Sequence, residues 1–305
     1  GKQIITYKEA MIPENQPKSL VIIGAGAIGV EFAHFYQTFG TEVTIIEALP
    51  NILPVEDEDI STELEKLFKK RKMNIFTNTM VEKIEKNKSK VKVHLKSGEI
   101  IEADKALIAV GVQGNIENLG LENCNITVEE GWIKVNEYME TSLSNVYAIG
   151  DVAGPPWLAH VASAEGITAV EHLAGLNPDP MKYDNIPGCT YCHPEVASVG
   201  LTEKAAKEKG YEVKIGNFPF RGLGKSMAVG DTDGFVKVVY DAKYGEMLGC
   251  HILGAEATNL ITEAVIARNL ETTHREVLKT IHPHPTLSEA IMEATADALE
   301  EAIHI

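Results

Sequence analysis

Apolar residues in the first 110 positions alternate between short continuous runs and runs at helical spacing. Residues 20–23 form a short apolar run, a glycine-rich turn follows, and residues 30–39 have the spacing of a helix. The segment 41–48 is a second predicted strand. Residues 58–72 predict an amphipathic helix. Its apolar side chains on one face include Leu64, Leu67 and Phe68.

The antiparallel part of the same region lies between residues 91 and 111. Its pattern predicts two strands around a Ser97-Gly98 turn and then a strand that reaches Val110. The order strand, helix, strand, helix, strand is typical of a doubly wound parallel sheet, here with an antiparallel insertion.

The pattern changes beyond residue 140. A strand is predicted up to the turn at Gly150-Asp151, followed by a helix at about 160–173. The proline-rich segment 177–188 is the best candidate for a domain boundary.

The C-terminal part of the chain combines strand patterns with helical ones. Segments 210–220, 234–241 and 246–254 are predicted strands, and 256–269 and the segment after Pro285 are predicted helices. This order predicts an α+β domain in which helices pack on an antiparallel sheet.

Composition and charge narrow the class of protein. A chain of 305 residues with 44% hydrophobic and 24% charged residues is typical of a globular protein with more than one domain. The net charge of −16 argues against a nucleic-acid partner, because phosphates would be repelled, and permits a basic protein partner. No apolar run approaches the roughly 20 residues that a spanning helix needs, so no membrane partner is expected.

The cysteines are few for this length: Cys124, Cys189, Cys192 and Cys250. This usage favours a reducing compartment, and we expect the cytoplasm, or the mitochondrial matrix in a eukaryotic cell. Cys189 and Cys192 have C-x-x-C spacing, but no second pair suggests zinc and the residues between them have a strand pattern. We expect structural thiols rather than redox or metal chemistry.

The segment VIIGAGAIGVEFA matches the G-x-G-x-x-G fingerprint at Gly24, Gly26 and Gly29, between a predicted strand and a predicted helix. Gly24 permits the tight turn, Gly26 lets a pyrophosphate approach the backbone, and Gly29 lets the helix pack closely on the strand. Glu47 ends the next strand, where a carboxylate accepts hydrogen bonds from both ribose hydroxyls and repels a 2′-phosphate. The fingerprint predicts a site for NAD rather than NADP.

The segment TIHPHPTLSEAIMEA places His282 and His284 each before a proline, which predicts a stiff, non-helical arm. Thr286 and Glu289 have the spacing of a capping box for the last helix. A metal pair is an alternative for the two histidines, but no matching ligand set stands nearby, so no metal is predicted.

The segment TSLSNVYAIGDV carries a second candidate, Asp151, after its Gly-Asp turn. A carboxylate there can accept hydrogen bonds from a polyol chain, although Gly-Asp is a common turn. Together, GAGAIGVE, TSLSNVYAIGDVAGPPWLAH, HPEVASVGLTE and HPHPTLSE make the chain resemble the flavoprotein disulfide reductases. The resemblance covers essentially the whole chain and is greatest to the dihydrolipoamide dehydrogenases.

The resemblance implies an α/β Rossmann-type NAD domain, a central segment that completes an FAD site, and a C-terminal α+β dimerisation domain. Residues 1–16 correspond to a segment linking from an FAD domain, and residues 17–138 to the NAD domain. Residues 139–185 correspond to the central segment, and 186–305 to the dimerisation domain. The implied NAD contacts are Gly24, Ala25, Gly26, Ala27, Ile28, Gly29, Glu31, Glu47, Val81 and Gly111, and the implied FAD contacts are Asp151, Trp157, Leu158, Ala159 and His160.

The resemblance assigns catalysis to the HPHPTLSE motif. His284 matches the catalytic acid/base and Glu289 the carboxylate that orients it, so that a dithiol is deprotonated and oxidised through an enzyme disulfide, FAD and finally NAD. In the family this histidine faces the disulfide of a partner subunit, which implies a homodimer. Further implied partners are dihydrolipoamide carried by an acyltransferase or an H-protein, and a basic peripheral subunit-binding domain.

The chain also departs from the family. VGVQGN lacks the arginine that often follows Gly111, and Trp157 stands where methionine is frequent. The family's redox disulfide has C-x-x-x-x-C spacing in an FAD domain upstream, and none of the four cysteines fits. We therefore expect a chain that lacks the FAD domain, binds FAD weakly or not at all, and is inactive by itself.

Two other functions stay open. A glutathione-reductase-like enzyme shares the histidine motif, but it typically has alanine at the third fingerprint glycine and basic residues for NADP, against Gly29 and Glu47 here. A non-catalytic binding or dimerisation module is the alternative of a different class. An NAD oxidoreductase without flavin would leave residues 141–160 and the His284 arm unexplained.

Overall fold

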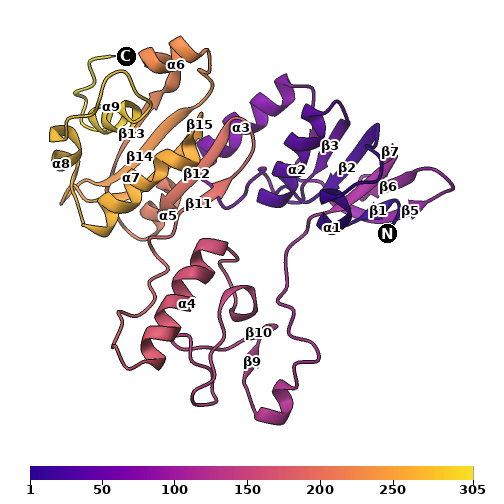
Figure 1. Ribbon diagram of the computed structural model, residues 1–305. Coiled ribbons are helices and arrows are strands. Elements are labelled where there is room, and N and C mark those ends of the chain that lie inside the picture. The colour runs from indigo at the N-terminus through magenta and orange to yellow at the C-terminus, as the bar shows by residue number, and fades with distance from the viewer. Residues whose placement is uncertain (305) are drawn as a thin grey trace. The chain divides into compact units, whose positions relative to one another are not determined.

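The computed structural model describes residues 1–304, and Figure 1 shows their fold. The chain forms two compact units: residues 1–110 together with the chain from 187 onward, and residues 111–186. The functional division at residues 17–138, 139–185 and 186–305 stays a prediction.

A parallel sheet of five strands organises the first 110 residues, in the order β1-β8-β2-β3-β4. Every neighbouring pair in it is parallel, as the alternation of strands and helices predicts. Its strands are β1 (Ile4–Ile5), β2 (Ser19–Ile23), β3 (Glu42–Ile46), β4 (Asn74–Phe76) and β8 (Lys105–Ile108), and its helices are α1 (Tyr7–Met11), α2 (Ala27–Thr38) and α3 (Glu58–Lys70).

The predicted antiparallel insertion is a sheet of three strands between β4 and β8. It consists of β5 (Val81–Lys86), β6 (Val91–Leu95) and β7 (Ile100–Ala103). Strand β6 alternates between buried and half-buried positions, with Val91, Val93 and Leu95 buried. This alternation is the period-2 pattern of a strand with one face on a core.

The part from residue 187 onward is an antiparallel sheet with helices, as predicted. The strand order is β11-β12-β15-β14-β13, and α7 packs on β12 and β15 while α9 packs on β13 and β14 (Figure 1). The elements are β11 (Gly188–Thr190), β12 (Glu195–Gly200), α5 (Glu203–Glu208), β13 (Val213–Pro219), η3 (Phe220–Gly222), α6 (Gly224–Val229), β14 (Phe235–Asp241), β15 (Met247–Gly254), α7 (Ala257–Asn269), α8 (His274–Lys279) and α9 (Glu289–Asp297).

The two parts of the first unit share one hydrophobic core. Leu64 and Phe68 of α3 belong to the same buried cluster as Val196 and Leu253 of the antiparallel sheet and Cys192 beside it. Helix α3 and the sheet therefore bury apolar surface in one core although they are far apart in the sequence, which accounts for their folding as one unit.

A buried ionic cluster lies within this shared interior. Nζ of Lys237 on β14 lies 2.8 Å from Oδ1 of Asp57 and 2.8 Å from Oε2 of Glu203, and it also contacts Asp59. The side chains of Lys237 and Asp57 are each 3% exposed. Burial of these charges is tolerated because each is paired.

The second unit, residues 111–186, has little regular structure apart from one long helix. It contains η1 (Leu121–Cys124), β9 (Val128–Glu129), β10 (Trp132–Ile133), η2 (Gly150–Ala153) and α4 (Ala159–Leu173). The strand predicted before Gly150 was wrong: Tyr147 makes only an isolated bridge to Glu140. An apolar pattern forms a strand only where a neighbouring segment offers a continuous ladder, and no such ladder forms there.

No helix within residues 1–304 is long and apolar enough to cross a membrane.

Candidate functional site

The glycine-rich loop has the geometry that a dinucleotide fingerprint requires. Gly24 has φ of +100°, and a Cβ there would lie 2.4 Å from the carbonyl oxygen of Ala109. A Cβ at Gly29 would lie 2.0 Å from the carbonyl oxygen of Gly24, whereas a Cβ at Gly26 would meet no atom within 4 Å. The outer glycines thus permit tight packing, and the middle one leaves open space beside the start of α2.

The start of α2 offers a positive, accessible surface. Gly26 is its N-cap, and the first turn contains no acidic residue that would offset the helix dipole. Ala27 is exposed and Ile28 is 36% exposed, while Ala25 is buried. Backbone N–H groups at such a helix start are suited to a pyrophosphate.

Glu47 lies directly after β3 and is bonded to the loop. Its Oε2 accepts a hydrogen bond from the backbone N–H of Ala25 at 2.7 Å, and its Oε1 accepts one from Leu49 at 2.8 Å. Each carboxylate oxygen has a second lone pair, so these bonds leave capacity for ribose hydroxyls. The Glu47 side chain therefore orders the glycine-rich loop. Its spacing from the fingerprint in the sequence did not predict this role.

Glu31 projects from α2 toward β11. Its Oε1 accepts a hydrogen bond from the backbone N–H of Tyr191 at 2.8 Å. Burial raises the pKa of Glu31, and this hydrogen bond partly opposes the rise. Glu31 is therefore held by a residue 160 positions away. The family resemblance, which gave Glu31 as an NAD contact, did not predict this hydrogen bond.

The two remaining NAD candidates are not part of this loop. Val81 begins β5 and packs partly against the core of the insertion. Gly111 begins the second unit, has φ of +83°, and would carry a Cβ into open space.

The FAD candidates gather within the second unit. Asp151 is exposed in η2, which packs on α4. Trp157, Leu158, Ala159 and His160 lead into the first turn of that helix. The Trp157 ring lies against Trp132, with centroids 5.2 Å apart. Both parts of the implied FAD set thus lie within this unit, on η2 and at the start of α4.

A buried carboxylate that the sequence did not single out supports this turn. Glu165 on α4 is 3% exposed; its Oε2 accepts the N–H of Gly150 at 2.7 Å, and its Oε1 accepts the hydroxyl of Tyr183 at 2.8 Å. This geometry fixes the backbone directly before Asp151. A glutamate inside a predicted helix carries no signal of such a role.

The histidine arm lies outside any helix, between α8 and α9, as its prolines predict. Nδ1 of His284 lies 2.9 Å from Oε1 of Glu289, and Oε2 of Glu289 accepts the N–H of Thr286 at 2.8 Å. The His284 side chain is 74% exposed and the Glu289 side chain 16%. The structure therefore brings together the two residues proposed for catalysis and leaves the imidazole accessible.

The electrostatics of Glu289 suit an orienting carboxylate. Although burial acts to raise its pKa, the N–H of Thr286 and the imidazole of His284 hold it below its usual range. Glu289 is thus ionised at neutral pH and can accept a hydrogen bond from the imidazole of His284.

The predicted capping box was wrong in one half. Glu289 is the first residue of α9, Ser288 is its N-cap, and the hydroxyl of Thr286 donates to the carbonyl oxygen of Pro283 at 2.8 Å instead of capping the helix. Only the carboxylate half forms, through the Thr286 N–H. The extended arm places Thr286 before the helix rather than at its cap.

All four cysteines are free. Burial raises the pKa of Cys192 and of Cys250 to about 12, and burial also raises that of Cys189. Such thiols are poor nucleophiles. Cys189 is half-buried and Cys192 buried, which agrees with the expectation of structural thiols for this pair.

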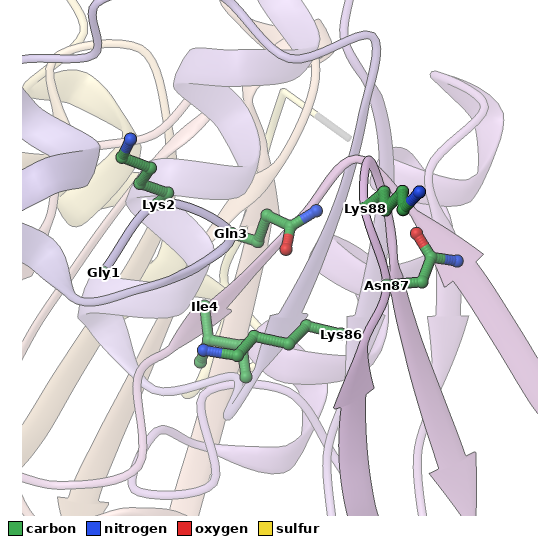
Figure 2. A pocket seen from close by; sticks show the side chains of 7 residues that line it. All are labelled: Gly1, Lys2, Gln3, Ile4, Lys86, Asn87 and Lys88. Carbon is green, nitrogen blue, oxygen red and sulfur yellow. The ribbon is translucent and has the colours of Figure 1, made fainter.

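A hollow of about 620 Å³ lies between the N-terminal residues and the turn of the β5–β6 hairpin. Figure 2 shows the residues that line it, among them Lys2, Lys86 and Lys88. None of its lining residues belongs to the candidate site.

Two family models match the chain. One, described as pyridine nucleotide-disulphide oxidoreductase, matches residues 1–166, and the other, its dimerisation domain, matches residues 186–295. The chain belongs to the pyridine nucleotide-disulphide oxidoreductase family. The resemblance inferred from the sequence motifs is confirmed, and so is the fold class.

Curated members of the family include close relatives. The chain is 50% identical over 303 residues to dihydrolipoyl dehydrogenase of Rhizobium etli, covering 98% of this chain and 63% of that protein. It is 48% identical to dihydrolipoyl dehydrogenase of Zymomonas mobilis, covering 100% of this chain and 66% of the relative. The chain thus spans just under two thirds of the length of these relatives.

Solved structures of the family agree with the fold. The flavoprotein disulfide reductase RclA of Escherichia coli superposes with a TM-score of 0.91 at 27% identity, over 96% of this chain and 68% of that one. LpdA of Mycobacterium tuberculosis superposes with a TM-score of 0.89 at 27% identity, over 96% and 64% respectively.

Proposed function

We propose that this chain is part of a dihydrolipoyl dehydrogenase, which oxidises dihydrolipoamide and passes the electrons through FAD to NAD. The observation that carries the proposal is the His284–Glu289 pair on its exposed arm. The identity of about half of all residues to proteins with that name supports it.

His284 acts as the base in this proposal. Its imidazole takes a proton from a substrate thiol, and the resulting thiolate is the nucleophile for disulfide exchange. Glu289 accepts the Nδ1–H of His284, which leaves Nε2 as the proton acceptor and stabilises the imidazolium that forms. Thr286 holds the second oxygen of Glu289, so the carboxylate cannot rotate away.

The cofactor sites follow from the two candidate clusters. Gly26 and the start of α2 would receive the NAD pyrophosphate, and Glu47 its ribose, with Glu31, Val81 and Gly111 as further contacts. Asp151 and residues 157–160 would hold FAD, together with groups beyond these residues. When bound, the flavin supplies two-electron transfer between a dithiol and NAD.

The partners follow from the same assignment. The dimerisation domain would pair two subunits, so that His284 of one faces the redox disulfide of the other. The net charge of −16 suits a basic subunit-binding domain of an acyltransferase core, and the lipoyl group would arrive on that core or on an H-protein. A cytoplasmic or matrix location fits these partners.

A glutathione-reductase-like activity is the second candidate enzyme. Gly29 argues against it, because the alanine typical of that enzyme would place a Cβ 2.0 Å from the Gly24 carbonyl oxygen, and Glu47 argues against NADP. A non-catalytic binding module would need neither the His284–Glu289 pair nor the glycine loop.

The test compares substrates and one variant in the complete flavin-containing protein. Dihydrolipoamide with NAD should be turned over at least about 100-fold faster than glutathione with NADP. His284→Gln should lower the rate of dihydrolipoamide oxidation by roughly 10²- to 10⁴-fold, the usual contribution of a general base. A His284→Gln protein with unchanged turnover would contradict the proposal.

A further inference from the structure

His282, the other histidine of the arm, is almost completely buried. Its side chain is 4% exposed, in contrast to that of His284. Nε2 of His282 lies 2.7 Å from Oε1 of Glu263 on α7, and Nδ1 lies 3.0 Å from the carbonyl oxygen of Thr280. Both ring nitrogens face acceptors, so both must donate, and only the imidazolium has two N–H groups.

The environment of His282 supports this charge. Glu263 raises the pKa of His282, with burial acting in the opposite direction and Thr280 and Glu289 assisting the rise. The Glu263 side chain is 36% exposed, so the pair is only partly shielded from water and is screened somewhat less than a surface pair.

Glu263 lies on a rigid part of the fold. It belongs to α7, whose Ile261 and Ala264 are fully buried against the antiparallel sheet. The link from Glu263 to His282 therefore ties the arm to a packed helix 19 positions earlier in the sequence.

His284 lies between two fixed points of the arm. On one side His282 is held by Glu263 and Thr280, and on the other Glu289 begins α9. The Thr286 hydroxyl bridges back to Pro283 between them. Without the first anchor, the segment before His284 would be attached to the fold only through α8.

We propose that His282 and Glu263 form a positioning pair. The pair holds the arm so that the Nε2 atom of His284 stays within proton-transfer distance of the substrate thiol. The pair does not touch the substrate; it acts through His284. This inference rests on the proposed function, since it assigns the pair a part in the same proton transfer. When a catalytic base is displaced by about 1 Å, the reaction rate falls by up to about 10²-fold.

The experiment uses His282→Gln, Glu263→Ala and Glu263→Gln in the complete flavin-containing protein. Two assays are run on each: oxidation of dihydrolipoamide by NAD, and oxidation of NADH by ferricyanide, which needs flavin and NAD site but no base for a thiol. The control is His94→Gln, which breaks a His94–Glu85 contact of 3.0 Å on the β5–β6 hairpin.

For His282→Gln and Glu263→Ala, kcat for dihydrolipoamide should fall by roughly 10- to 100-fold with KM within about twofold, since the thiol still binds but meets a misplaced base. The ferricyanide rate should stay within about twofold of the unaltered protein. Glu263→Gln keeps an oxygen acceptor for His282, so it should retain several-fold more activity than Glu263→Ala. His94→Gln should change neither assay.

Two outcomes would overturn the inference. Equal losses in both assays would show that the pair only stabilises the fold, and unchanged kcat in both His282→Gln and Glu263→Ala would show that the arm needs no such anchor. If His284→Gln itself leaves dihydrolipoamide oxidation intact, the proposed function fails first, so the two failures are distinguishable.

Discussion

The imidazole of His284 contacts Glu289 through Nδ1 at 2.9 Å, and the same carboxylate holds the backbone of Thr286 with its other oxygen. One carboxylate thus fixes both the imidazole and the backbone that leads into α9. The orientation of the His284 ring therefore depends on the backbone at Thr286 as well as on the contact between the two side chains.

We predict that Glu289→Gln lowers kcat for dihydrolipoamide oxidation by about 10- to 100-fold. The amide oxygen can still accept the Thr286 N–H, but the negative charge that stabilises the imidazolium is lost. The measurement is kcat for dihydrolipoamide oxidation beside the rate of NADH oxidation by ferricyanide, which needs no base. Equal kcat in Glu289→Gln and the unaltered protein would show that Glu289 serves the backbone alone.

The lowered pKa of Glu289 also has a consequence for folding. A carboxyl whose pKa is depressed in the folded state stabilises that state above its unfolded pKa, and loses this contribution as pH falls through the folded value. The stability difference between the unaltered protein and Glu289→Gln should therefore shrink in acid, as measured by denaturant unfolding at about pH 7 and about pH 3.

Replacing Glu47 tests the NAD assignment. Glu47→Gln should raise KM for NAD by about tenfold and change kcat by less than about twofold, because uniform binding energy is lost. The matched control is Glu42→Gln, at the exposed start of the same strand, which should leave KM for NAD unchanged. Equal effects of the two substitutions would argue against a ribose contact.

Gly26 and Gly29 give opposite predictions for the same change to alanine. A Cβ at position 29 would overlap a backbone oxygen at 2.0 Å, so Gly29→Ala should lower the free energy of unfolding by about 1–3 kcal/mol. Gly26→Ala meets no atom within 4 Å and should change stability by less than about 0.5 kcal/mol.

Binding separates the two variants further. If the open space at position 26 is the pyrophosphate site, Gly26→Ala should weaken NAD binding by about tenfold or more, measured by titration of the folded protein. Tight NAD binding by Gly26→Ala would place the pyrophosphate elsewhere.

The buried lysine cluster predicts a large stability effect. Lys237→Met should lower the free energy of unfolding by about 3–5 kcal/mol, because Asp57 would remain buried without its partner. Lys92→Met, which removes an exposed pair with Glu102, is the control and should cost less than about 1 kcal/mol. Denaturant unfolding at neutral pH measures both.

The same cluster determines how stability depends on pH. Although burial opposes it, the hydrogen bond from Lys237 lowers the pKa of Asp57, and the three carboxylates raise that of Lys237. The contribution of Asp57 is present above its unfolded pKa and is lost as pH falls through the lowered value. The difference between the unaltered protein and Asp57→Asn should therefore be greatest near neutral pH and decline in acid.

The elements with strong local patterns were predictable from sequence. Helix α3 and its buried residues Leu64, Leu67 and Phe68 follow from apolar spacing alone, and the turn at Gly24 follows from glycine chemistry. The strand before Gly150 was not predictable, since the same apolar pattern needs a neighbouring ladder that its unit does not form.

The sequence by itself determined the order of strands and helices, the glycine loop, and the identity of the family, because these depend on local backbone preferences and on motif spacing. Tertiary structure alone decided which distant group each carboxylate meets: Glu31 the backbone N–H of Tyr191, Glu263 the imidazole of His282, and Asp57 the ammonium of Lys237. These partners lie between 19 and 180 positions apart. Only the packing of sheets and helices brings such distant groups within hydrogen-bonding distance, and no local pattern encodes that packing.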